Sequence, residues 1–481
     1  MEDERNMETL NNIENKYDIQ NIYFNRYQVW PIVRMALFFQ LRKRNNLQIN
    51  NKKKIDKINL LTLLLNILDI KNLKAIINLI AGKKKFVLLS DSLELRNING
   101  HSIDKIAYNL IDIINEEDVL IIENSYHARL PRNILYKSYL YQDLITLAFQ
   151  IYTKIIYLKK TKIENERLIQ EILIKLNISL NYKYIIAEFI ASYKCYRMLF
   201  KIGNIKAIFV NCYYSFQNQA AVFAARELNL NVIELQHGVI NKEHLAYNFS
   251  IPLEGKYFPN YLFAFGEYVR DILRESKYIK NQNILAVGNA YIDYIKDEYN
   301  PQAEIFDYFQ SIRNKYDCII GVSLQEIYED ETMEFISRAA MLDRCIYYIL
   351  VPRIYKKHSG SQVNVEIINI NNSDLDIYKI IFSSDFHSTV NSTCALEAPA
   401  LGVANIFINI DNKSREYYGN MLNPIYNRYA NDPNEFVKII KEWVPPNKEI
   451  IKSMHTEYFE NDNRSKIIEA LDRIGIQNQY K

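Results

Sequence analysis

Residues 220–238, AAVFAARELNLNVIELQHG, contain the pattern that decides the fold. The alanine-rich stretch 217–228 is typical of a helix, and the apolar run 231–235 has the length of a buried parallel strand. The strand would end in the polar tripeptide Gln236-His237-Gly238. A helix followed directly by a buried strand is the repeating unit of a parallel α/β sheet.

The same alternation extends in both directions along the chain. Further strands are expected at 86–90, 119–122 and 207–211, and then at 261–265, 284–287, 318–322, 345–351, 377–382 and 404–409. Helices are expected at 136–200, with a break at 176–181, and at 391–401, 434–443 and 465–474. This order implies parallel sheets with right-handed crossovers. We therefore expect an α/β protein with two Rossmann-like, doubly wound domains, the second series starting at 261–265.

Chain length also favours two domains, because 481 residues are too many for one ordinary core. The expected organisation is an N-terminal helical extension (1–84), two Rossmann-like domains (85–255 and 256–455) and a C-terminal helix (456–481). Within the extension, residues 23–41 and 58–80 are the main helical segments.

Composition excludes several classes of protein. The net charge of +3 does not suggest a nucleic-acid binder. The five cysteines are scattered and never form CxxC, which fits a reducing cytoplasm and argues against a zinc or disulfide framework. The acidic, polar start of the chain does not resemble a signal peptide. The expected location is the cytoplasm.

Residues 58–80 come closest to a membrane segment. Polar residues recur there at helical spacing and leave a broad apolar face, but Lys71 and Lys74 interrupt the run before the roughly 20 apolar residues that a membrane span requires. Seven basic residues lie upstream: Arg42, Lys43, Arg44, Lys52, Lys53, Lys54 and Lys57. Such an amphipathic helix either packs on the protein's own core or contacts the inner membrane peripherally, and both interpretations stay open.

His237 is the first candidate for chemistry. In doubly wound sheets ligands bind at the carboxyl ends of the strands, and the expected strand 231–235 delivers His237 to that edge, with Gln236 and Gly238 beside it. A neutral imidazole there could take a proton from a hydroxyl, and its cation could offset phosphate charge. The competing interpretation is a histidine that only hydrogen-bonds within a turn.

The stretch 382–402, FSSDFHSTVNSTCALEAPALG, provides the second candidate site. A strand would end before a polar loop that carries Ser388, and Ser392 and Thr393 would open a helix whose free N–H groups can bind phosphate. Glu397 lies one helical turn further, where a carboxylate could accept hydrogen bonds from a sugar diol. The alternative is an ordinary capped helix with Glu397 in a surface pair.

Three further groups follow expected strands. Arg353 and His358 belong to a basic loop that could neutralise a diphosphate, although solvated side chains are equally compatible with the pattern. Ser323 ends the strand 318–322 and could reach a donor phosphate or cap a local turn. Asp91 and Arg96 follow the first strand and would suit an acceptor.

These segments together resemble a known family. Residues 220–238 are similar to the segment ending in Gln-His-Gly in GT-B-type glycosyltransferases of bacterial capsule and lipopolysaccharide synthesis. Residues 391–408 resemble the Ser-Thr-x-x-x-Glu-Ala-x-x-x-Gly donor signature of that superfamily, shared with wall teichoic acid glycerophosphotransferases and UDP-N-acetylglucosamine 2-epimerases. Residues 261–273 and 284–293 resemble the start of a GT-B donor domain. The resemblance extends from Phe86 to Ile474.

The resemblance implies a nucleotide-sugar donor on the second domain, a glycan or lipid-linked glycan acceptor on the first, and a cleft between them. The donor signature falls on Ser392, Thr393, Glu397 and Gly402, and the other motif on Gln236, His237 and Gly238. Where relatives carry a Lys-Pro-His-Pro-like segment, this chain has VPRIYKKH at 351–358, so Arg353 or His358 would substitute.

GT-B enzymes replace a metal with helix dipoles and basic side chains, so the resemblance implies no metal. The Asp374-Leu375-Asp376 motif would precede the strand 377–382, at the amino end of the sheet and away from the cleft. We expect no cofactor apart from the nucleotide-sugar substrate.

The resulting hypothesis is a glycosyltransferase that extends a surface glycan, with His237 as general base or charge stabiliser. A nucleotide-sugar 2-epimerase and a polyol-phosphate transferase are the enzyme alternatives. A non-catalytic polysaccharide assembly factor is the alternative from another class.

Overall fold

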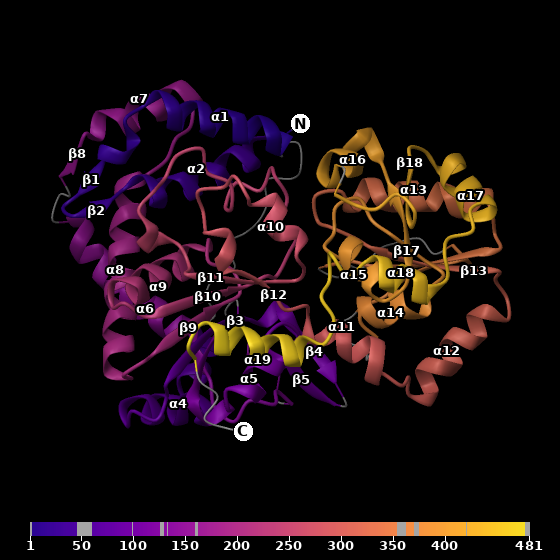
Figure 1. Ribbon diagram of the computed structural model, residues 1–481, viewed down its shortest axis with the longest axis horizontal. Coiled ribbons are helices and arrows are strands. Elements are labelled where there is room, and N and C mark those ends of the chain that lie inside the picture. The colour runs from indigo at the N-terminus through magenta and orange to yellow at the C-terminus, as the bar shows by residue number, and fades with distance from the viewer. Residues whose placement is uncertain are drawn as a thin grey trace. The chain divides into compact units, whose positions relative to one another are not determined.

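The computed structural model describes residues 2–45, 60–98, 100–125, 129–131, 133–158, 162–353, 362–369, 375–419 and 421–476. The chain forms two compact units and passes between them more than once. Unit 1 comprises Met1–Ala264, Val269–Ala286 and Arg464–Lys481, and unit 2 comprises Phe265–Tyr268 and Val287–Asn463. Each unit contains a parallel sheet of its own (Figure 1).

The sheet of unit 1 has seven parallel strands in the order β12-β11-β10-β9-β3-β6-β7. They are β3 (Phe86–Asp91), β6 (Val119–Asn124), β7 (Leu140–Tyr141), β9 (Ala207–Val210), β10 (Asn231–Leu235), β11 (Tyr261–Ala264) and β12 (Ile284–Ala286). The central strands are apolar and almost completely buried, as parallel strands between two layers of helices must be. The strands expected before residue 236 are confirmed.

One expectation about this sheet is wrong. Residues 261–265 and 284–287 were expected to start the second series, but β11 pairs in parallel with β10, and β12 pairs with β11. Both strands therefore extend the first sheet, with the short helix α10 (Tyr268–Ile272) between them. An apolar run predicts a buried strand, but it does not predict which sheet that strand will join.

The helices of unit 1 pack around these strands. They are α5 (Tyr108–Ile113), α6 (Gln142–Leu158), α7 (Glu166–Leu176), α8 (Tyr182–Ile202), α9 (Phe216–Glu227) and α19 (Asn463–Arg473). Helices α6, α8 and α9 lie together beside the strands, and α19 lies beside α5 (Figure 1). The expected break at 176–181 is confirmed, because Asn177 adopts a left-handed φ of 51° and Asn181 caps α8.

The N-terminal segment is helical at both ends but not throughout. Helices α1 (Glu2–Lys16) and α2 (Trp30–Asn45) flank the hairpin of β1 (Tyr23–Phe24) and β2 (Tyr27–Gln28), which pairs with β8 (Ile163–Glu164). The helix expected at 23–41 is therefore wrong over its first turns, because Asn25 (φ 54°) turns the chain back into a hairpin. Buried Glu14 joins the two helices by accepting hydrogen bonds from Trp30 and Arg34.

The helix expected at 58–80 is two helices, α3 (Leu60–Ile67) and α4 (Ile70–Ile80). Asp69 separates them because its carboxylate accepts a 2.9 Å hydrogen bond from the Lys71 N–H and caps α4. Among the described residues, no helix is long and apolar enough to cross a membrane.

Unit 2 is built on six parallel strands in the order β15-β14-β13-β16-β17-β18. They are β13 (Cys318–Ser323), β14 (Ile346–Val351), β15 (Val365–Ile367), β16 (Phe386–Ser388), β17 (Ala404–Ile408) and β18 (Asn427–Ala430). Its helices are α11 (Ala290–Asp293), α12 (Ala303–Arg313), α13 (Glu329–Leu342), α14 (Ile377–Ser383), α15 (Cys394–Ala400), α16 (Lys413–Tyr418), α17 (Pro433–Glu442) and α18 (Lys448–Met454). In Figure 1, α13 and α17 lie on one side of the strands, and α14, α15 and α18 on the other.

A second expectation is wrong here. Residues 377–382 form α14 rather than a strand, because the Asp376 side chain accepts hydrogen bonds from the N–H groups of Tyr378 and Lys379 and starts a helix. The strand of this region is β16, and the helix expected at 391–401 starts only at Cys394. Asp376 is thus a helix cap, whereas Asp374 lies outside the described residues.

The predicted fold class is confirmed: two α/β units with parallel sheets follow an N-terminal helical region. The cleft between them stays a prediction.

Candidate functional site

His237 follows β10 at the carboxyl edge of the unit 1 sheet. The Gln236 side-chain amide donates a 2.8 Å hydrogen bond to the Gly238 carbonyl and closes the turn that carries the imidazole. The Tyr214 hydroxyl lies 3.3 Å from Nε2 of His237 and 3.5 Å from Nε2 of His244. The motif histidine therefore belongs to a His-Tyr-His group in which the tyrosine hydroxyl contacts both rings.

Glu234, a buried acid of β10, supports this group. Glu234 accepts hydrogen bonds from the hydroxyls of Tyr247 (2.8 Å) and Tyr278 and from the Tyr213 N–H (3.2 Å). Burial raises the pKa of Glu234 to about 7, although these hydrogen bonds favour the ionised form. Because Tyr213 precedes Tyr214, Glu234 helps to fix the turn that brings the Tyr214 hydroxyl to His237.

A second polar cluster lies on the neighbouring strands of unit 1. Ser90 donates a 2.6 Å hydrogen bond to Asp104, and the Asn211 amide donates a 3.3 Å hydrogen bond to the same carboxylate oxygen. Glu123 is directly opposite Ser90 across β3 and β6 and is fully buried. Burial raises the pKa of Asp104, and it raises that of Glu123 well above its usual range. The edge therefore holds two acids whose pKa values are raised by burial.

The predicted acceptor residues Asp91 and Arg96 lie beside this cluster. Asp91 accepts a 2.9 Å hydrogen bond from the Leu93 N–H, and Arg96 lies on β4 (Leu95–Ile98), which forms a hairpin with β5 (His101–Asp104). Although burial alone would raise the pKa of Glu94, the positive charges of Lys105 and Arg96 and its interaction with His237 lower it. Arg96 and His237 thus act on the same carboxylate, whereas Asp91 shapes the local turn.

In unit 2, Ser323 ends β13 beside a buried histidine. The Ser323 hydroxyl lies 2.9 Å from His387 Nε2, and His387 Nδ1 lies 2.7 Å from Asn405 Oδ1. His387 is fully buried within β16, so the polar loop expected at this position is a strand. Burial lowers the pKa of His387 to about 4, which keeps the ring neutral near pH 7. The imidazole therefore holds the Ser323 hydroxyl in place.

Further hydroxyls gather at the same edge. Ser388 is directly opposite Val322 on the neighbouring strand, and the Thr389 hydroxyl donates a 2.9 Å hydrogen bond to the Ser323 carbonyl. The Ser388 hydroxyl is buried and has no hydrogen-bond partner among the described residues. Because a buried hydroxyl normally has a partner, this one has unused hydrogen-bonding capacity.

The predicted phosphate-binding helix is short. Ser392 Oγ accepts a 3.3 Å hydrogen bond from the Cys394 N–H at the start of α15, while the Thr393 side chain makes no capping bond. Glu397 is only 1% exposed and accepts a 3.0 Å hydrogen bond from the Tyr378 hydroxyl. The surface pair considered for Glu397 is therefore wrong, and its contact with a sugar diol stays a prediction.

The remaining candidates are less constrained. Arg353 is exposed at the end of β14, and His358 lies outside the described residues. Within the described parts of the chain, no three His, Cys, Asp or Glu side chains are grouped so that they could hold a metal ion.

The structure adds residues that the sequence patterns did not identify: Tyr214, His244, Glu94, Asp104, Glu123 and Glu234. Tyr214 had a usable signal, because it closely follows the expected strand 207–211 and would reach the same edge as His237. His244 and the acids had none, since their roles depend on tertiary contacts.

Fold and site together define an α/β protein whose two Rossmann-like units each place polar side chains at the carboxyl ends of parallel strands. No protein-family model matches the chain, and no curated protein matches its sequence.

Solved structures with which the chain shares similarity include UDP-N-acetylglucosamine 2-epimerases. The enzyme from Neisseria meningitidis, bound to UDP-GlcNAc, has a TM-score of 0.48 and 12% identity over 81% of this chain and 100% of its own. The enzyme from Methanocaldococcus jannaschii has a TM-score of 0.47 and 13% identity over 81% and 99%. The wall teichoic acid polymerase TagF has a TM-score of 0.44 and 14% identity over 89% and 100%. Both kinds of protein are among those that the sequence motifs resemble.

Proposed function

We propose that the protein is a metal-independent glycosyltransferase that moves a sugar from a nucleotide-activated donor to a surface glycan of the capsule or lipopolysaccharide type. The observation that carries the proposal is the hydroxyl cluster of unit 2. Ser323, Ser388 and Thr389 meet at the carboxyl ends of β13 and β16, the Ser388 hydroxyl has unused hydrogen-bonding capacity, and Ser392 precedes α15. Such an edge is where α/β sheets bind nucleotides.

Hydroxyls and free backbone N–H groups suit the oxygens of a diphosphate, because they donate hydrogen bonds and bring no negative charge. Exposed Arg353, at the end of β14, can add a positive charge. Unit 2 is therefore the proposed donor-binding unit.

In the proposed reaction, an acceptor hydroxyl oxygen forms a bond to the anomeric carbon of the donor sugar. The bond from that carbon to the diphosphate oxygen breaks, and the nucleoside diphosphate leaves. His237 takes the acceptor proton on the ring nitrogen that faces it, and Tyr214 fixes the ring orientation. The positioned imidazole is the feature of unit 1 that supports this role.

Donor binding can be tested by thermal shift with UDP, CDP, CMP, GDP and their sugars. A ligand that binds only the folded protein increases the free energy of unfolding, by about 2.7 kcal/mol at a ligand concentration of a hundred times Kd, and so raises Tm. We expect one nucleotide family to raise Tm and Ser388→Ala to reduce the shift. Ser311→Ala, on exposed α12, is the matched control. If no member of the panel binds, or both variants behave alike, the donor site is disproved.

Catalysis requires a second assay. Release of nucleoside diphosphate should depend on added glycan and should be lost in His237→Ala, while nucleotide binding persists. Formation of an epimer from UDP-N-acetylglucosamine without acceptor would instead establish the epimerase alternative. Full glycan synthesis in cells that carry only His237→Ala would favour an assembly factor.

We also propose that α4 contacts an anionic membrane peripherally. Asn72 and Ala75 attach this helix to unit 1, whereas Ile70, Ile77 and Ile80 on another face are 81%, 65% and 67% exposed. Isolated exposed apolar residues are ordinary, but a stripe along one helix face usually has a binding partner.

The positive charge of the sequence around α4 indicates an anionic partner. Residues 42–85 contain twelve Lys and Arg, two Asp and no Glu, a net charge of +10 in a chain whose total is +3. Each basic residue near an anionic leaflet contributes about 1 kcal/mol. An apolar stripe within a basic segment therefore fits a bilayer surface rich in anionic lipid.

Vesicle co-sedimentation tests the membrane proposal. The protein should bind phosphatidylglycerol-containing vesicles more strongly than phosphatidylcholine vesicles, and Ile70→Ser with Ile77→Ser should abolish the binding. Ile174→Ser with Ile450→Ser, at exposed positions on α7 and α18, is the control. Equal binding by both double variants, or dimerisation through α4 in ultracentrifugation, would disprove it.

A further inference from the structure

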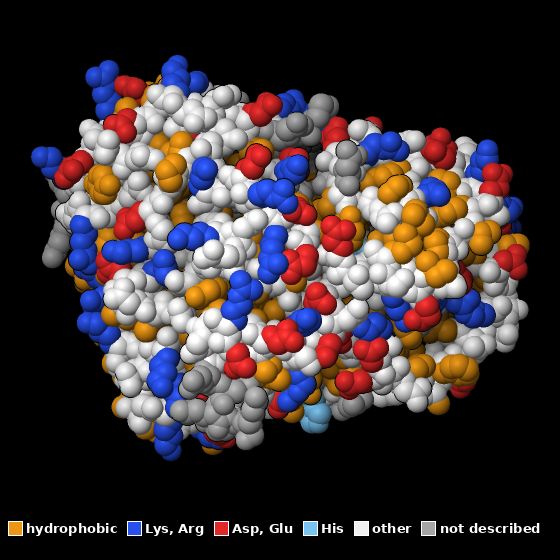
Figure 2. Space-filling view, in the orientation of Figure 1, with side chains coloured by type: hydrophobic (Ala, Val, Ile, Leu, Met, Phe, Trp, Pro, Cys, Tyr) orange, Lys and Arg blue, Asp and Glu red, His pale blue; other side chains and the backbone are white. Residues whose placement is uncertain are grey.

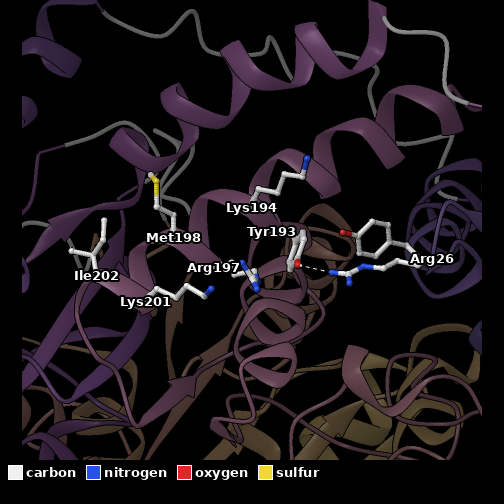
Figure 3. Close-up of a pocket in the computed structure, with 8 residues that line it drawn as sticks. Arg26, Tyr193, Lys194, Arg197, Met198, Lys201 and Ile202 are labelled. Atoms are coloured by element: carbon white, nitrogen blue, oxygen red, sulfur yellow. Dashed lines mark hydrogen bonds between the residues drawn. The ribbon is translucent and has the colours of Figure 1, made fainter.

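A basic pocket lies on the outer side of unit 1, between α8 and the turn that joins β1 to β2. Its volume is about 480 Å³, and its lining residues are Arg26, Tyr27, Tyr193, Lys194, Arg197, Met198, Lys201 and Ile202. Tyr193, Arg197 and Lys201 follow one another at intervals of one helical turn, so they share a face of α8. Figure 3 shows these three side chains in a row that continues to Arg26.

Positive charge in this pocket exceeds the negative charge that the fold supplies. Arg26 pairs with Glu227 at 3.1 Å, and Arg197 lies 3.9 Å from the same carboxylate. Lys201 forms no ion pair with any described residue, although it is one turn from Arg197. Like charges at this spacing destabilise a helix slightly, and a bound anion would remove that cost.

Arg197 supplies a second, independent observation. Its Nε–H is buried and has no hydrogen-bond partner among the described residues. The Glu227 carboxylate, at 3.9 Å, is too far to accept a hydrogen bond from this group, so the donor loses its hydration without gaining a hydrogen bond. The pocket therefore contains an unsatisfied donor beside an excess of positive charge.

The apolar side chains at the rim of the pocket favour an anionic ligand that also carries a sugar. Met198 and Ile202 are exposed beside the row of cations and offer an apolar strip of the kind that packs against the C–H face of a sugar ring. Guanidinium groups donate paired hydrogen bonds to phosphate oxygens. Figure 2 shows Lys and Arg side chains concentrated at the margin of the molecule over α8 and α6, which would attract an anionic chain.

We propose that this pocket binds a phosphate-bearing segment of a glycan chain, with Arg26, Arg197 and Lys201 on the phosphate and Met198 and Ile202 against the sugar. The identity of this chain as the acceptor rests on the proposed transferase function. Binding here would hold the growing polymer on unit 1, on the outer surface of α8, between rounds of transfer.

Binding of a phosphorylated mannan and of unphosphorylated mannan of the same length tests the proposal. The protein should bind the phosphorylated polymer more tightly, and the preference should weaken with added salt. Arg197→Gln with Lys201→Gln should lower that affinity by about tenfold or more, because two charge-assisted contacts are lost. Lys183→Gln with Lys175→Gln removes the same charge at the far end of α8 and on α7, and should leave the affinity unchanged.

The outcomes separate this proposal from the donor site. The pocket variant should keep the nucleotide-induced rise in Tm that Ser388→Ala reduces. Equal binding of both mannans, or equal effects of the two charge variants, would overturn the pocket whatever the nucleotide result. If the pocket variant lost vesicle binding but kept its binding to phosphorylated mannan, the pocket would be a membrane-binding surface, and the proposal would likewise be overturned.

Discussion

Glu234 is a buried acid whose charge depends on the tyrosines that surround it. Two hydroxyls and one backbone N–H stabilise its ionised form, but burial dominates and raises its pKa to about 7. A single side chain of β10, three residues before His237, therefore changes charge in the physiological pH range.

The stability of the protein should reveal this titration. Because the pKa of Glu234 is higher in the folded chain than in the unfolded chain, the unfolded chain releases its proton first as pH rises from about 4 to 7. The free energy of unfolding should fall by up to about 3 kcal/mol over this window. Glu234→Gln lacks the titration, so its stability relative to wild type should increase with pH. Urea unfolding at pH 5, 6, 7 and 8 measures the difference, and parallel curves would contradict the assignment.

Tyr214 should matter to His237 without mattering much to the fold. Removing its hydroxyl in Tyr214→Phe frees the imidazole to rotate, so we expect about a tenfold lower transfer rate, equal to the loss of one hydrogen bond. The pH–rate profile should shift while the circular dichroism melt stays the same. Tyr184→Phe, at an exposed position on α8, is the control. An unchanged pH profile in Tyr214→Phe would show that the contact does not position His237.

Individual site residues could be found from sequence only where they follow a strand. That pattern placed His237 and Ser323 at the ends of β10 and β13, whereas Ser388 was predicted from an expected strand that is the helix α14. It missed the contacts that give them their environment, because these link distant segments: Tyr278 is 44 residues from Glu234, and His387 is 64 residues from Ser323. Hydrogen-bond partners of buried groups depend on sheet register, which no local pattern contains.

At the scale of elements, apolar runs identified most of the strands but not their partners. Residues 377–382 are as apolar as a buried strand. They form a helix because the Asp376 side chain caps its first turn. Strands β11 and β12 were found correctly, yet their sheet was assigned wrongly, because edge pairing is decided by the whole fold. Alternation of helices and strands nevertheless sufficed for the fold class.

The signature glycine Gly402 illustrates how an element boundary can look like a ligand motif. It follows α15 with a φ of +80°, and a Cβ there would lie 2.9 Å from the Lys448 carbonyl of α18. Only glycine combines this backbone conformation with so close an approach. Its place in the donor signature is therefore explained by packing of α18 against the end of α15.

Gly402→Ala should destabilise unit 2 by about 3 kcal/mol, from left-handed strain and from the displacement of α18. Gly419→Ala separates the two causes, because Gly419 also has a positive φ but nothing within 4 Å of the added Cβ. We expect that control to lose only about 1 kcal/mol. Chemical denaturation followed by tryptophan fluorescence, with Trp443 in unit 2, measures both. Equal losses in the two variants would show that the close approach is unimportant.

For the whole molecule, the two units are not consecutive halves of the chain. After completing unit 2, the chain returns to unit 1 as α19, where Arg464 pairs with Asp112 at 2.6 Å and Arg473 donates to the Gln282 carbonyl. Ile467 and Leu471 of this helix are almost fully buried. The last helix is thus part of the core of the first unit.

Truncation after Asp462 should therefore weaken unit 1, although it removes residues that follow unit 2. Loss of the buried side chains of Ile467 and Leu471 and of the Arg464–Asp112 ion pair should cost several kcal/mol, about 2 for each aliphatic side chain. Amide hydrogen exchange should rise in α5 and in the turn Asn281–Asn283 before β12, which α19 contacts through Asp112 and Gln282, and stay low in β13 and β16. Truncation after Ile476, which leaves α19 intact, provides the control. Faster exchange confined to unit 2 would show that α19 stabilises the second unit instead.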